Sequence, residues 1–248
     1  MLLLVCVLLA AAFAFGLKKP IKKAPWVFYI LAILIDLLII YSAQLNLPQW
    51  AWKTVVLANG RCLFAFGLFT VVMFLGVLKD GSKPKRWLMP IRAELSIIAG
   101  ILTVGHIVRY LGVYSPRVLS NPASVANGML ASFVVAFILA VLLVVLTITS
   151  FKFVKRHMNA SLWKGIQRLA YPFFVLIYAH VLLIMLRPAL MGADNALISL
   201  IVYGAIVVAY VVLRVLRYRD DKLAKAAKAE AHAHPAKVVP MDEPMLAD

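Results

Sequence analysis

Apolar and polar positions alternate along this chain in long blocks, without the short period of a soluble helix or strand. Seven blocks are almost wholly apolar, and most approach the roughly 20 residues that cross a lipid bilayer as a helix. They cover residues 1–17, 26–45, 54–78, 92–114, 128–150, 163–186 and 195–216. The pattern predicts an all-α fold, a polytopic membrane bundle of about seven transmembrane helices.

Short basic clusters separate these blocks in a regular order. The loops after the first, third, fifth and seventh blocks are rich in lysine and arginine, whereas the loops between them hold only Lys53, Arg117 and Arg187. Basic loops of a membrane protein stay on the cytoplasmic side. The alternation therefore predicts a multi-pass protein with its N-terminus outside and its C-terminus in the cytoplasm.

Composition and charge support the membrane assignment. The 248 residues are 64% hydrophobic, well above the 45–50% typical of soluble domains, with a mean hydropathy of +0.95. The net charge of +16 resides in the loops and tail, so no soluble basic domain is present to bind nucleic acid. Both cysteines, Cys6 and Cys62, lie in apolar blocks without a CxxC pair, which argues against disulfide, zinc and iron–sulfur frameworks.

Three regions follow from this pattern. Residues 1–25 form an N-terminal transmembrane helix with a basic loop, and residues 26–219 form the main bundle. Residues 220–248 are rich in Ala, Lys and His and lack apolar periodicity, so we expect a disordered cytoplasmic tail.

Two histidines stand inside apolar blocks, where ionisable groups are costly and point to function. His106 lies fourteen residues after Arg92, roughly 21 Å along a helix, and His180 lies twelve residues after Arg168, roughly 18 Å. Two neutral imidazoles at similar depth on two helices can supply both axial ligands of a haem iron. Hydrogen bonds between helices, a proton relay or a zinc site are the alternatives.

Several charged residues near these histidines are further candidates. Arg61 and Arg109 could pair with haem propionates, the alternative being contact with lipid headgroups. Asp36, in the middle of the second block, could pair with Arg61, serve a proton or quinone site, or pack by a hydrogen bond. Glu94 is expected to be solvated or paired with Arg92.

Four short patterns carry a resemblance to a known family. They are Asn59-Gly60 before an apolar helix, then Arg92, Leu95 and His106, then Thr149-Ser150 followed by Trp163, Leu169, Tyr171 and His180, and finally Leu-Arg-Tyr-Arg at 216–219. Over roughly residues 59–219 the chain resembles the ferric-reductase-like transmembrane domain family. Within that family it is most similar to the MsrQ (YedZ) group, the haem-binding membrane subunits of periplasmic methionine sulfoxide reductase systems.

The resemblance implies a haem-binding core of six helices, to which the first helix here is an addition. It also implies that His106 and His180 ligate haem b. One position departs from the family pattern, because Gln167 stands where the family has a histidine associated with haem binding. We therefore expect one haem, in the outer half of the bundle.

The expected function is that of an electron-transfer subunit in a bacterial cytoplasmic (inner) membrane. Electrons would come from quinol or a cytoplasmic flavin reductase, with quinone or FMN as a further cofactor. They would leave to a periplasmic or extracellular reductase, such as a methionine sulfoxide reductase. No GxGxxG follows a strand pattern, and the tail is too short for flavin and nicotinamide domains.

Two other functions are weighed against this one. In a non-redox transporter or scaffold, the histidines would only pack or relay protons. A ferric reductase acting directly on extracellular metal would need an outer metal site, but the outer loops offer no carboxylate cluster.

Overall fold

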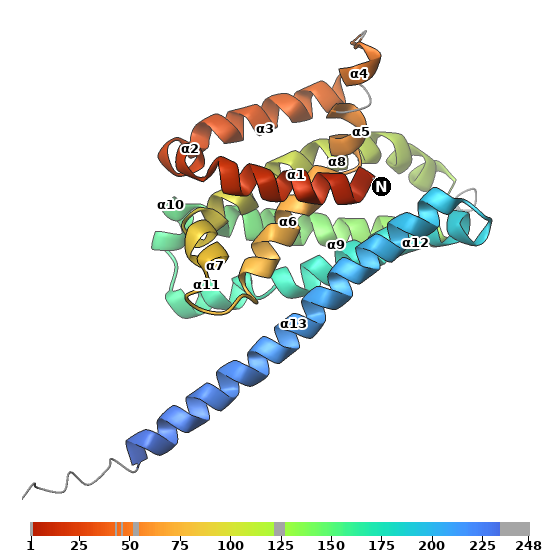
Figure 1. Cartoon of the computed structure of the whole chain (residues 1–248). Helices are drawn as coiled ribbons and strands as arrows, with labels where there is room; N and C mark the ends of the chain where they lie inside the picture. The colour runs from red at the N-terminus through yellow and green to blue at the C-terminus, as the bar shows by residue number, and fades with distance from the viewer. Residues whose placement is uncertain (1, 43, 46, 52–54, 122–126, 234–248) are drawn as a thin grey trace, which may run out of the picture.

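The structure, a computed structural model, describes residues 2–42, 44–45, 47–51, 55–121 and 127–233 (Figure 1). These residues form helices and turns with no strand among them, which confirms the all-α prediction. In chain order the helices are α1 (Leu2–Gly16), α2 (Lys18–Lys23), α3 (Pro25–Ile40), α4 (Gln49–Ala51), α5 (Leu57–Gly60), α6 (Leu63–Leu75), α7 (Lys83–Leu88), the 3-10 turn η2 (Met89–Ile91), α8 (Arg92–Ser120), α9 (Asn127–Ser150), α10 (Lys152–Arg156), α11 (Ala160–Gln167), α12 (Ala170–Leu190) and α13 (Asp194–Ala233).

All seven predicted apolar blocks coincide with helices. Four helical stretches are long and apolar enough to cross a membrane, namely Lys83–Ser120, Gly128–Ser150, Ala160–Leu190 and Asp194–Ala227. The apolar helices α1, α3 and α6 are shorter, at 15, 16 and 13 residues. The chain is thus a multi-pass membrane bundle built from long and short helices.

The third block is not one continuous helix. A turn at Arg61 and Cys62 separates α5 from α6, and Cys62 adopts a left-handed backbone with a φ of 58°. Non-glycine residues seldom take this conformation. The predicted start of the block at residue 54 lies outside the described residues. The sixth block is likewise interrupted at Arg168 and Leu169, between α11 and α12.

The last helix is longer than the sequence suggested. Disorder was expected from residue 220, but α13 continues to Ala233 and extends away from the bundle (Figure 1). Residues 223–233 are mainly Ala, Lys and Glu, which have high helix propensity, so helix forms there without an apolar face. Residues 234–248 lie outside the described part of the chain.

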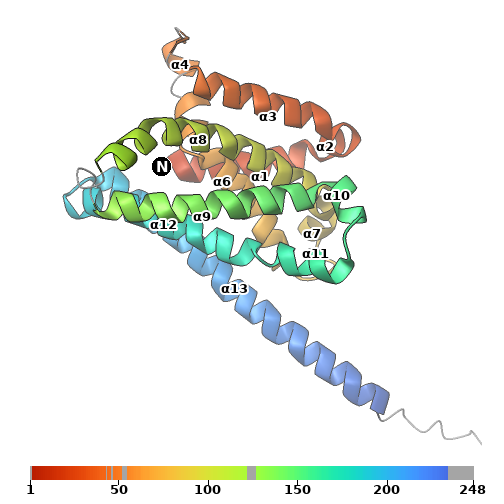
Figure 2. The same cartoon turned by 180° about the vertical axis from the view of Figure 1, so that it is seen from behind.

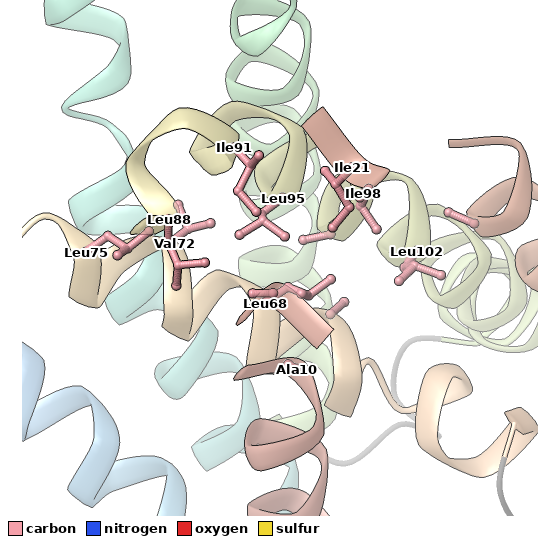
Figure 3. Packing of buried hydrophobic residues seen from close by; sticks show 14 residues of the cluster. Ala10, Ile21, Leu68, Val72, Leu75, Leu88, Ile91, Leu95, Ile98 and Leu102 are labelled. Carbon is pink, nitrogen blue, oxygen red and sulfur yellow. The ribbon is translucent and has the colours of Figure 1, made fainter. Parts of the chain in front are cut away.

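Close approach of small residues holds the first helix in the bundle. α1 packs along α6, and a Cβ at Gly67 would lie 2.8 Å from the Cβ of Ala10 and 2.9 Å from the Cys6 carbonyl oxygen. In lipid, helices associate through such close van der Waals contact. Around this contact, α1, α6 and α8 share an apolar core that includes Leu68 and Leu95 (Figure 3).

The short basic helices gather at one end of the bundle. α2, α7, α10 and α11 lie together there in both views, whereas α4 and α5 lie at the opposite end (Figures 1 and 2). We call this the basic end. The lysines and arginines that are scattered over three loops in the sequence therefore meet on one face, as the alternation of the loops requires.

Candidate functional site

The two intramembrane histidines share one cavity. The cavity has a volume of about 90 Å³ and lies between α6, α8, α9 and α12. Both His106, on α8, and His180, on α12, line it. The other lining residues are Cys62, Phe66, Phe69, Thr103, Ile107, Ala136, Leu139, Ala140, Leu143, Phe173 and Ile177. We call this level of the bundle the histidine layer.

Small side chains leave room between the four helices. Ala136 and Ala140 are one turn apart on α9, so they present the same face of that helix to the cavity. Apart from the imidazoles, only Thr103 and Cys62 bring polar or polarisable atoms to the wall. The cavity is therefore an apolar space into which two imidazoles bring nitrogen atoms.

The break between α5 and α6 orients His106. Its Nδ1 lies 2.8 Å from the carbonyl oxygen of Gly60, the last residue of α5. A carbonyl oxygen only accepts hydrogen bonds, so Nδ1 must carry the proton and donate it. The other ring nitrogen, Nε2, then keeps its lone pair. The neighbouring Tyr110 ring, with its centroid 4.6 Å from that of the imidazole, further restricts ring rotation.

His180 is held by one residue of α9. Its Nδ1 lies 2.9 Å from the hydroxyl of Ser132 and 3.2 Å from the Ser132 carbonyl oxygen. Because the Ser132 carbonyl oxygen only accepts, Nδ1 donates to it, and the Ser132 hydroxyl donates in turn to the His180 carbonyl at 3.4 Å. Ser132 is only 1% exposed, so this contact is shielded from competing water. The Nε2 atom of His180 is again left with its lone pair.

Both imidazoles thus share one chemical state. Each uses Nδ1 for a hydrogen bond within the protein and leaves Nε2 available as a metal ligand, an arrangement typical of metal-binding histidines. No group of three or more His, Cys, Asp or Glu able to hold a metal ion occurs among the described residues. A cofactor that brings its own equatorial ligands, as haem does, needs only two protein ligands.

The two candidate arginines lie elsewhere. Neither Arg61 nor Arg109 lines the cavity. Arg61 is exposed at the turn before α6, next to the cavity residue Cys62. Arg109 instead binds the end of α3, because its Nη1 donates to the Ser42 hydroxyl at 3.0 Å and contacts the Ile39 carbonyl at 3.4 Å. The structure therefore gives Arg109 a role in joining α8 to α3.

Asp36 is buried against α8 and does not form the ion pair with Arg61 that was one of its alternatives. It is 5% exposed, whereas Arg61 is exposed, and no salt bridge joins them within the described part of the chain. A Cβ at Gly105 would lie 2.5 Å from Asp36 Oδ1, so only glycine allows this approach. The carboxylate thus packs against the residue that precedes His106.

Gln167 lies at another level, nearer the basic end. Its Nε2 donates to the Thr149 hydroxyl at 2.9 Å, and the Trp163 indole N–H donates to the Thr149 carbonyl at 3.0 Å. We call these three residues the glutamine layer. The amide at the position of the family histidine is therefore engaged with α9.

The expectation for Glu94 was wrong. Glu94 is only 4% exposed and pairs with Lys152 of α10 at 2.9 Å, rather than being solvated or paired with Arg92. This ion pair joins α10 to the start of α8. The two segments are far apart in the sequence, so sequence reasoning could not reveal the pairing. Sequence reasoning also missed Ser132, which lies 48 residues before its histidine partner and has no local motif.

Similarity to a known family of membrane proteins agrees with this architecture. Residues 61–178 match the model of the "Ferric reductase like transmembrane component" family. That segment of the chain is similar to this family. The ferric-reductase-like segment includes α6, α8 and α9 and the part of α12 up to residue 178, so His106 lies within it and His180 lies just beyond its end. The predicted family resemblance is therefore confirmed, whereas closeness to the MsrQ group stays a prediction.

A second comparison extends beyond the ferric-reductase-like segment. An uncharacterized protein of Treponema pallidum (strain Nichols) is 35% identical over 202 residues, which cover 81% of this chain. The aligned region spans 56% of that relative's own length. No solved structure matches the chain significantly.

Proposed function

We propose that the chain is a transmembrane b-type cytochrome subunit that holds one haem between His106 and His180. The observation that carries this proposal is the shared state of the two histidines. Both line one apolar cavity, and both use Nδ1 internally, so two Nε2 lone pairs remain for an iron.

The residues around the cavity would set the properties of the cofactor. When bound, haem supplies a one-electron carrier within the apolar interior. The Gly60 carbonyl and Ser132 fix the two imidazoles and increase their basicity as ligands. The apolar wall excludes water. Arg61, beside Cys62, is our candidate for a propionate partner, whereas the bonds of Arg109 to α3 favour a packing role.

The proposed route runs across the membrane. The positive-inside rule assigns the basic end to the cytoplasm, the N-terminus to the outside and the C-terminus to the inside of a bacterial cytoplasmic membrane. Quinol or a cytoplasmic flavin reductase would donate electrons. A periplasmic or extracellular reductase, such as a methionine sulfoxide reductase, would receive them. The ferric-reductase-like match supports membrane electron transfer in general.

Haem stoichiometry tests the proposal most directly. The full chain is purified in detergent after expression with ample haem supply. A dithionite-reduced minus oxidised spectrum is then recorded, and haem is quantified per chain as the pyridine haemochrome. We expect a b-type spectrum and about one haem per chain. Absence of haem would reject the proposal and favour a transporter or scaffold. The donor is identified next, by adding a quinol or a flavin reductase with NADH to the oxidised protein.

A further inference from the structure

An exposed tryptophan at the basic end is surrounded by three cations. The indole N–H of Trp87, in α7, donates to the carbonyl oxygen of Phe15, near the end of α1, at 3.3 Å. The Nζ atom of Lys18, the first residue of α2, lies 3.7 Å from the centroid of the Trp87 ring. Lys83 and Arg86 share a face of α7 with Trp87 and line one open hollow with it. We call Lys18, Lys83, Arg86 and Trp87 the tryptophan pocket.

Buried neighbours hold the two short helices of the pocket in place. Leu88, which follows Trp87 on α7, and Ile21 of α2 are both buried in the apolar core that includes Leu95 (Figure 3). These anchors fix the rotation of α7 and α2 about their axes. Lys83, Arg86 and Trp87 are exposed as a consequence, on the side of α7 that faces away from this core.

The cations of the tryptophan pocket have no carboxylate partner in the described part of the chain. No salt bridge there involves Lys18, Lys83 or Arg86. The nearest contrast is Lys85 on the same helix, which pairs with Asp80 at 2.8 Å. The loop before α7 thus gives its carboxylate to Lys85, and the pocket keeps three positive charges around one aromatic ring. Such a concentration of charge attracts an anion.

An apolar stripe of α1 leads away from the pocket. Leu4, Leu8 and Phe15 recur at helical spacing on one side of α1, and they are between 44% and 62% exposed. Helical backbone hydrogen bonds continue across the junction of α1 and α2, so Lys18 follows Phe15 by one turn on that side. From residue 4 to residue 15 the stripe is roughly 16 Å long. This is close to half of the roughly 30 Å hydrocarbon core, the depth that one lipid leaflet fills.

An anionic phospholipid matches both the pocket and the stripe. Lysine and arginine donate charge-assisted hydrogen bonds to phosphate oxygens. Tryptophan is at home at the level of lipid headgroups, where one part of its ring is apolar and its N–H is polar. A zwitterionic headgroup would bring an ammonium group next to three cations, so the charges of the pocket favour a lipid with net negative charge.

We propose that the tryptophan pocket binds the headgroup phosphate of one anionic phospholipid, with an acyl chain along the Leu4–Leu8–Phe15 stripe. The lipid supplies the counter-charge for the three cations and joins α1 and α2 to α7 in the leaflet that meets the basic end. No residue of the pocket or of the stripe lines the cavity of the histidine layer. The proposal therefore does not depend on haem.

Native mass spectrometry of the full, delipidated chain tests the site by titration with dioleoyl phosphatidylglycerol and, separately, dioleoyl phosphatidylcholine. We expect the first phosphatidylglycerol to bind at least tenfold more tightly than the first phosphatidylcholine. The double variant Lys83→Gln with Arg86→Gln should weaken phosphatidylglycerol binding tenfold or more, because it removes two of the three cations. The matched control is Lys155→Gln with Arg156→Gln, which removes the same two residue types from exposed positions of α10 at the same end of the bundle. It should bind as the wild type does.

Three outcomes would overturn the proposal. Equal weakening in the α10 control would mean that lipid is attracted by the charge of the whole basic end. Displacement of the lipid by millimolar inorganic phosphate would assign the pocket to free phosphate. Unchanged lipid affinity in the Lys83 and Arg86 double variant would leave the pocket to another anion, such as an acidic protein surface. If the double variant is not monodisperse, Lys83→Gln alone replaces it, and a severalfold loss is then expected.

A short-chain lipid tests the stripe separately from the pocket. Dihexanoyl phosphatidylglycerol has the same headgroup as the dioleoyl lipid but cannot cover the stripe from Phe15 to Leu4. We expect it to bind at least tenfold more weakly, since it buries less apolar surface. Equal affinity of the two lipids would show that the headgroup binds alone and would overturn the assignment of the stripe to an acyl chain.

Discussion

The histidine layer and the glutamine layer share helix α9, yet they differ in chemistry. In the histidine layer, α8 and α12 direct two imidazoles into one cavity, and neighbouring backbone groups hold Nδ1 of each. In the glutamine layer, the α11 amide donates to Thr149 of α9. Two facing helices are thus insufficient to create a ligand site. Space from small residues and an internal partner for Nδ1 of each imidazole are also needed.

Removing either histidine of the histidine layer should have the largest effect on haem content. In His106→Ala or His180→Ala, one axial position is lost, so we expect haem per chain to fall about tenfold or more, as measured by the pyridine haemochrome. His157→Ala is the matched control, because His157 is exposed and bonds only within its own segment, to Phe153. Full haem retention in both ligand variants would exclude the histidine layer as the haem site.

Much of the fold was predictable from residue pattern, because membrane helices must satisfy their backbone hydrogen bonds internally. The block lengths located all seven apolar helices, and the basic loops anticipated a single basic end. The break at Cys62 was not predicted, because the third block was treated as one continuous helix, although Asn59-Gly60, a dipeptide typical of turns, directly precedes it. The extension of α13 to Ala233 was missed because the sequence analysis took the lack of apolar periodicity as a sign of disorder. The high helix propensity of Ala and Lys was enough to form a helix there.

Of the candidate site, only the two histidines were predictable. His106 and His180 stood out as ionisable groups in apolar blocks, and their matched depth agrees with one shared cavity. Their partners did not stand out, because Gly60 contributes a backbone carbonyl and Ser132 is an ordinary small residue of an apolar helix. Contacts of this kind depend on helix rotation, which the composition of an all-round apolar helix does not specify.

Filling the cavity should reduce haem binding without touching a ligand. In Ala140→Leu, the added side chain occupies space between α9 and the histidines, so we expect haem per chain to fall severalfold while the bundle remains folded. Ala131→Leu, on an exposed position of the same helix, adds the same volume outside the cavity and should retain haem. Equal haem content in the two variants would mean that the cofactor does not use this cavity.

Weakening the support of one imidazole should have a smaller effect. Ser132→Ala removes the hydroxyl that lies 2.9 Å from His180 Nδ1 but leaves the backbone carbonyl at 3.2 Å. Loss of a partner of this kind typically lowers metal affinity 10–100-fold, so we expect about tenfold weaker haem binding, the lower limit. Haem titration of the apoprotein measures it. Thr103→Val alters the cavity wall without removing an imidazole partner and serves as the control.

Replacing Gln167 of the glutamine layer with histidine should have the smallest effect on haem content. Gln167→His restores the residue type of the family pattern, but its counterpart at the start of α8 is Arg92, whose guanidinium does not ligate iron. The Thr149 hydroxyl would also remain as a hydrogen-bond partner for the new imidazole. Haem should therefore stay near one per chain, with an unchanged difference spectrum. A second haem in Gln167→His would show that one histidine suffices in the glutamine layer. The contrast between the layers would then rest on residue 167 alone rather than on cavity space and imidazole support.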